Sequence, residues 1–199
     1  MKKAIFMIVL MVACQSNKKS DDQKSLNQST GKSEDGRAES SSKESVKTVM
    51  AFLKWYRDKQ GEFDQFHLVA NAWPNYDSTK FYEVNFPETE KYLAKLKSSG
   101  YISDQYLDHW RTYFKEHDKT MKEFPINDGP PDGFSFDLVL LTQEMDFTLN
   151  AIDTAKLIHV NESVKNSIVK IDIMMRLGFS LSKIEEKWLI DEIDNLGLE

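Results

Sequence analysis

Hydrophobic and polar residues alternate most clearly near the C-terminal end of the chain. Val169, Ile171 and Ile173 are separated by Lys170 and Asp172. This period of two is typical of a β-strand with one buried face, so the strand should turn Asp172 toward solvent. The pattern therefore predicts a sheet that buries one side.

Neighbouring segments predict further strands of the same sheet. Residues 179–184 and 187–193 are strand-like runs joined by Glu185-Glu186, which fits a tight hairpin, and residues 156–160 predict an earlier strand. Because a twisted sheet with one apolar face is not stable alone, helices must cover it. The sequence thus predicts an α+β fold, with about three N-terminal helices packed on a curved antiparallel sheet of roughly three to five strands.

The first predicted helix follows the polar N-terminal part of the chain. Ser41 with Glu44 three residues later fits a capping box, and Gly61 fits the C′ position after the last turn. Phe52 widens the apolar face, which indicates a helix covered on more than one side. The other apolar residues at helical spacing are Val46, Val49, Met50, Leu53 and Tyr56.

Two more helices are predicted downstream. Pro87 fits the first turn of a helix that ends near Gly100, and Ser103 fits the N-cap of another that extends to about Lys119. The third helix carries a stripe at helical spacing: Tyr106, Leu107, Trp110, Tyr113, Phe114 and His117. Such a stripe is typical of a core-facing surface, and the alternative, the wall of a ligand pocket, stays open.

Two segments fit no single periodicity. Residues 63–86 are interpreted as short strands or an ordered loop, and 134–149 as a mixture of extended and helical chain after the turn-rich stretch 124–133. Asp137 and Gln143 lie within or beside the apolar run of the second segment. Because buried polar groups need hydrogen-bond partners, these side chains are either site residues or anchors for the loop.

The N-terminus predicts export and a lipid anchor. Lys2 and Lys3 precede an apolar stretch, 4–12, that is too short to span a bilayer but suits a signal-peptide core. The stretch leads into Met-Val-Ala-Cys, which resembles a bacterial lipobox apart from a methionine in place of the usual leucine. We expect residues 1–13 to be removed and Cys14 to be acylated, which would anchor the chain to the outer membrane of a bacterial envelope, facing the periplasm or the cell surface. An ordinary signal peptide with a chance cysteine is the alternative.

Composition adds to this outline. Residues 14–43 are rich in Ser, Asn, Gln and charge, so they predict a flexible tether before a single domain over 44–199. Without Lys2 and Lys3 the chain has 24 basic and 32 acidic residues, a net charge of −8, which argues against a nucleic-acid partner. Cys14 is the single cysteine, so neither a disulfide framework nor a zinc–thiolate site is expected.

No pattern of reactive residues identifies a catalytic site. The sequence has no Gly-x-Ser-x-Gly elbow and no phosphate-binding glycine loop. The histidines, His67, His109, His117 and His159, form no His-x-x-x-His pair, and the stretch 124–133 does not match a calcium-binding loop. We therefore expect no metal and no cofactor, and we assign no catalytic residue.

Several phrases of the sequence are similar to one family. These phrases are residues 92–103, 127–134, 141–144 and 187–191. They resemble a family of uncharacterised Bacteroidetes lipoproteins over about residues 46–193. The resemblance implies the cystatin-like α+β cone shared by ketosteroid isomerase and nuclear transport factor, in which helices cross a curved antiparallel sheet above a pocket. It implies no particular activity.

These observations favour a non-catalytic, lipid-anchored envelope protein whose domain binds a small apolar ligand or a protein partner. The residues expected to line a pocket inside the cone are Phe52, Tyr56, Trp110, Asp137, Gln143 and Trp188. One alternative is an isomerase- or hydrolase-type enzyme with a carboxylate in that pocket. Another is an immunity or inhibitor protein with a filled cone and an exposed apolar or acidic patch.

Overall fold

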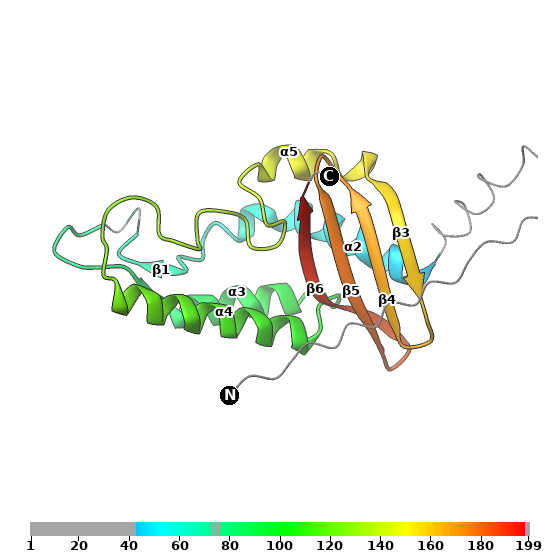
Figure 1. Ribbon diagram of the computed structural model, residues 1–199, viewed down its shortest axis with the longest axis horizontal. Coiled ribbons are helices and arrows are strands. Elements are labelled where there is room, and N and C mark those ends of the chain that lie inside the picture. The colour runs from blue at the N-terminus through cyan, green and yellow to red at the C-terminus, as the bar shows by residue number, and fades with distance from the viewer. Residues whose placement is uncertain (1–42, 73, 75, 198–199) are drawn as a thin grey trace, which may run out of the picture. The chain divides into compact units, whose positions relative to one another are not determined.

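The computed structural model describes residues 43–72, 74 and 76–197, which belong to one unit of the chain (Figure 1). The predicted signal peptide, the acylation site Cys14 and the tether up to residue 42 lie outside the described residues. Within the described part, no helix is both long enough and apolar enough to cross a membrane.

The described chain has the α+β fold that the sequence predicts. Its helices are α2 (Glu44–Lys59), α3 (Phe86–Lys97), α4 (Asp104–Glu123) and α5 (Met145–Asn150), with 3-10 turns η1 (Gln60–Glu62) and η2 (Ile152–Thr154). Its strands are β1 (Val69–Ala70), β2 (Glu83–Val84), β3 (Lys156–Glu162), β4 (Asn166–Asp172), β5 (Arg176–Ile184) and β6 (Lys187–Gly197). β1 pairs with β2, and β3 to β6 form a four-stranded antiparallel meander.

The main sheet follows the alternation of the sequence. Val169 and Ile171 on β4 are fully buried, while Asp172 is half-buried on the opposite face. Glu185 and Glu186 form the turn between β5 and β6, and their φ angles are positive, 49° and 65°. Positive φ at both positions is the type I′ geometry that matches the twist of paired strands. The predicted hairpin is confirmed.

α2 packs across one face of this sheet, where it contacts β4 and β6 (Figure 1). The space between them is filled by side chains of the hydrophobic core. Phe52 from α2 is fully buried there, and Trp188 from β6 is 5% exposed. Because protein interiors pack at crystal-like density, both rings have a structural role in this core.

The chain before α4 covers the outer edge of β6. Ile102 forms a parallel bridge with Ile190, and the Ser103 N–H donates to the Ile190 oxygen at 3.0 Å. The Ser103 side chain then accepts a hydrogen bond from the Tyr106 N–H, which confirms the predicted cap of α4. α4 therefore starts at a fixed point beside the sheet, and α3 packs on α4.

The N-cap of α2 differs from the local sequence prediction. Lys43 occupies the N-cap position without a side-chain cap bond, and the predicted cap Ser41 lies outside the described residues. The cap comes instead from β3, because the Glu162 carboxylate accepts from the backbone N–H of Ser45 at 3.0 Å and from its hydroxyl. The predicted end of the helix before Gly61 is confirmed, since α2 ends at Lys59, and the 3-10 turn η1 follows and satisfies the end of the helix.

Residues 63–72, 74 and 76–85 form a loop that contains the two short strands β1 and β2. Asn71 has a positive φ of 63° and fixes the tip of this loop. Its side-chain amide donates to the backbone oxygens of Asp77 at 3.0 Å and Lys80 at 2.7 Å, and its oxygen accepts from the Asp77 N–H at 2.6 Å. Asn is suited to this role because it tolerates positive φ and mimics backbone turn bonds.

The turn-rich stretch 124–133 is held against α4. The Tyr113 hydroxyl donates to the Gly133 oxygen at 2.6 Å. Gly133 has a φ of 78°, and a Cβ there would lie 2.3 Å from the His117 ring. This close approach requires glycine. It fixes the start of the following loop relative to α4.

We expect Glu162→Ala to lower the free energy of unfolding by about 1–2 kcal/mol, because it removes the acceptor of the Ser45 N–H and of the buried Ser45 hydroxyl, and with it the cap of α2. Urea unfolding of the variant and the parent measures this. Glu192→Ala, which removes an exposed carboxylate from β6, is the control and should change stability by less than about 0.5 kcal/mol. Equal effects of the two substitutions would refute the capping role.

Candidate functional site

A pocket opens between two segments that have no single periodicity in the sequence. Residues 60–72, which follow α2, form one wall, and the loop 131–145 forms the other. The cavity volume is about 490 Å³. We call this space the aromatic pocket; the aromatic side chains that line it are Tyr56, Phe63, Phe66, Tyr92, Phe134 and Phe136.

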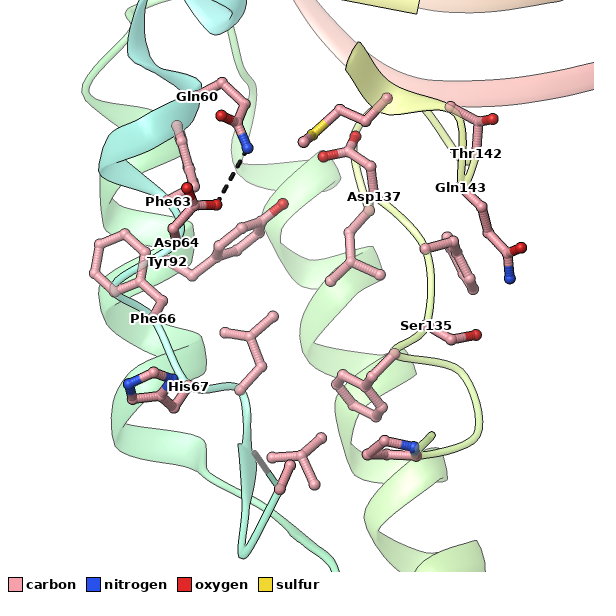
Figure 2. Close-up of a pocket in the computed structure, with 18 of the residues that line it drawn as sticks. Gln60, Phe63, Asp64, Phe66, His67, Tyr92, Ser135, Asp137, Thr142 and Gln143 are labelled. Atoms are coloured by element: carbon pink, nitrogen blue, oxygen red, sulfur yellow. Dashed lines mark hydrogen bonds between the residues drawn. The ribbon is translucent and has the colours of Figure 1, made fainter. Parts of the chain in front are cut away.

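The first wall is built from packed rings. Phe63 and Tyr92 meet edge to face with ring centroids 5.3 Å apart, and Phe66 packs on Tyr92 at 6.2 Å in the same way. Figure 2 shows these three side chains on one side of the pocket and Asp137 and Gln143 on the other. Edge-to-face pairs add stability beyond the burial of the rings. The wall is thus a preformed aromatic surface.

Asp137 anchors the second wall. Its Oδ1 accepts hydrogen bonds from the backbone N–H groups of Val139 at 3.0 Å and Leu140 at 2.6 Å, and its Oδ2 accepts one from the Tyr56 hydroxyl. The Asp137 N–H also donates to the Thr142 oxygen at 2.9 Å. The apolar turn closed by these bonds is fully buried. Asp137 is therefore an anchor for the loop that also faces the pocket.

Burial sets the electrostatics of this carboxyl group. It raises the pKa of Asp137, against the opposing effect of hydrogen bonds from Tyr56, Leu140 and Val139. Burial also raises the pKa of Tyr56 far above its ordinary value, with Tyr92 and Asp137 adding to the rise. Among the described residues, no lysine or arginine lines the pocket. The Asp137 carboxylate is therefore desolvated, and the groups that donate hydrogen bonds to it are neutral.

Two further phenols lie near Asp137. Burial raises the pKa of Tyr92 on α3 and of Tyr106 on α4, and the charge of Asp137 contributes to both rises. Figure 2 shows the Tyr92 hydroxyl directed toward Asp137. The Tyr106 hydroxyl is buried and has no hydrogen-bond partner in the described part of the chain. α2, α3 and the loop thus bring two phenols and a carboxyl group to the aromatic pocket, while Tyr106 lines a separate cavity.

The residues predicted to line a pocket are only partly brought together. Tyr56, Asp137 and Gln143 line the aromatic pocket. Trp110 lines a separate cavity of about 200 Å³ between α4 and β6. Phe52 and Trp188 lie in the filled core and line neither cavity. The pocket therefore lies beside the sheet-covering core and not inside the predicted cone.

Sequence analysis missed most of the aromatic wall. Phe63 and Phe66 follow the end of the first helix at a spacing of three, and Tyr92 lies beside Leu93 on the apolar face of the next helix. The spacing of the two phenylalanines was a usable signal, because it places two rings on one side of a turn. Their approach to Tyr92 depends on tertiary packing, which no local pattern encodes.

No family model, no curated protein and no solved structure matches this chain. The described residues contain no group of three or more His, Cys, Asp or Glu side chains that could hold a metal ion. The pocket residues are therefore interpreted from their own geometry and chemistry.

We expect the stability difference between the parent and Asp137→Asn to depend on pH. Because the folded-state pKa of Asp137 is raised, the folded parent binds a proton more readily than the unfolded chain, so its stability falls as pH rises from about 3.9 through that folded-state pKa. Asn cannot titrate, so the melting temperature of the parent minus that of the variant should decrease over this range.

Thermal melts at a series of pH values measure that difference. The matched control is Asp146→Asn, which changes an exposed carboxylate on α5 outside the pocket. A difference for Asp137→Asn that falls no more steeply with pH than that of the control would contradict the raised pKa.

Proposed function

We propose that the protein is a lipid-anchored envelope protein whose domain binds a small molecule in the aromatic pocket. The ligand has an apolar body and at least one polar group. The observation that carries this proposal is the pocket itself, in which preformed rings face the anchored carboxyl group of Asp137. Its volume of about 490 Å³ falls in the range of about 300–1,000 Å³ that is common for small-molecule sites.

The hydrogen bonding of Asp137 favours binding over catalysis. Both carboxylate oxygens already accept hydrogen bonds that hold the loop and α2 together. A general base needs an oxygen free to take a proton from the substrate. The alternative of an isomerase- or hydrolase-type enzyme is supported by one observation, the raised pKa of Asp137 beside the Tyr56 hydroxyl.

The position of the pocket favours a small ligand over a large partner. Phe63 and Tyr92 are buried at the base of its first wall, where a side chain or a small molecule reaches more easily than a folded surface. The core between α2 and the sheet is filled, as the inhibitor-type alternative requires. No comparable concave site among the described residues supports the inhibitor-type alternative.

We expect native mass spectrometry of the full chain, purified in mild detergent from the membranes of producing cells, to show an added small-molecule mass. Phe66→Ala removes a half-buried ring from the pocket wall and should release that mass. Phe147→Ala, which removes a ring that is 63% exposed outside the pocket, should retain it. A parent chain without added mass, or equal retention by both variants, would count against the pocket.

The lipid anchor has its own test. The parent chain should partition into the detergent-rich phase and carry the mass of acyl chains on Cys14, since several acyl chains give stable membrane attachment. Cys14→Ser should stay in the aqueous phase. Detergent-phase partitioning of that variant would show that attachment does not depend on the cysteine.

A further inference from the structure

The described lining of the aromatic pocket includes two carboxyl groups and one imidazole, that of His67. Asp64 and Asp137 line it, and none of its described lining residues is a lysine or an arginine. Lys59 and Lys95 are both paired with Glu62, which is outside the pocket lining. Both cations are therefore paired with Glu62, and no lysine or arginine among the described residues is paired with the pocket carboxylates.

The carboxyl group of Asp137 lacks the partner that a buried charge requires. Its hydrogen bonds come from a phenol and two backbone amides, all of them neutral. A desolvated carboxylate is costly unless a positive charge or a full set of donors compensates it. The pocket leaves room beside it for a positively charged ligand group.

The rings of the pocket favour the same kind of ligand. Phe63, Phe66 and Tyr92 form one wall, and Phe134 and Phe136 belong to the other. Aromatic faces attract organic cations through the ring quadrupole, and this attraction grows when the site is desolvated. An aromatic wall alone would accept any apolar compound. Rings together with carboxylates that have no lysine or arginine partner select for positive charge.

We infer that the ligand of the aromatic pocket is an organic cation, an apolar or compact body that carries an ammonium group. This inference rests on the proposed small-molecule function and specifies its ligand class. The ammonium group lies between the aromatic wall, which also carries Asp64, and the carboxylate of Asp137, and the apolar part contacts the phenylalanine rings. Anionic ligands are disfavoured because the described lining residues include two carboxylates and no lysine or arginine, His67 being the one basic side chain among them.

The test compares choline with 3,3-dimethylbutan-1-ol, which replaces the quaternary nitrogen by carbon and so removes only the charge. Both are titrated by NMR into the full chain in detergent. We expect choline to bind at least about tenfold more tightly, which corresponds to about 1.4 kcal/mol. Equal binding of the two probes would overturn the charge selectivity while leaving a small-molecule pocket in place.

Variants locate the effect in the pocket. Asp137→Asn should abolish the preference for choline, but it alters a loop anchor, so Asp64→Asn at the exposed rim provides a second reading and should weaken choline about threefold or more. Asp146→Asn, an exposed carboxylate outside the pocket, is the control and should leave binding unchanged. Equal loss in the Asp64 and Asp146 variants would overturn the assignment to the pocket.

The mass-spectrometry experiment separates this inference from the proposed function. A released compound that is cationic supports both. A released compound that is neutral or anionic overturns the cation assignment and retains the binding function. If no compound is released and neither probe binds, both proposals are wrong.

Discussion

The hydrogen bond between the Tyr56 hydroxyl and the Asp137 carboxylate joins parts of the molecule that are 81 residues apart. The same carboxylate holds the backbone of the turn 138–140, whose apolar side chains enter the core. One group therefore fixes the end of α2, the buried turn and the inner surface of the aromatic pocket. Removing the Tyr56 hydroxyl would leave the Oδ2 atom of Asp137 without a donor, which is the costly case for a buried polar group.

The location of the pocket follows from where apolar side chains can be packed. α2 and the meander bury rings such as Phe52 and Trp188 between them, so this interface is closed. Beyond the end of α2 the described chain up to residue 72 has only the 3-10 turn η1 and the two-residue strand β1, and the loop 131–145 covers that region only in part. Rings that a longer helix would bury in the core therefore line an open site.

Local patterns predicted the elements whose stability is local. The alternation in β4, the hairpin at Glu185-Glu186 and the cap at Ser103 depend on neighbouring residues, and all three are present. The end of α2 before Gly61 was also predicted, whereas the Glu162 cap of α2 depends on a contact across 117 residues and was not. Tyr56 and Asp137, which line the pocket from opposite walls, were each predicted as candidates from their residue type. Their hydrogen bond could not be predicted, because no sequence spacing encodes it.

Stability and binding make opposite demands on Asp137. As a loop anchor, Asp137 needs only to accept hydrogen bonds. An uncharged side chain of the same shape would avoid the cost of burying a charge. The raised pKa shows that this cost is present in the folded chain. A ligand with a positive charge would lower that cost on binding, because it favours the ionised carboxylate. The acidic residue at this position is thus more readily understood through binding of a cation than through loop stability alone.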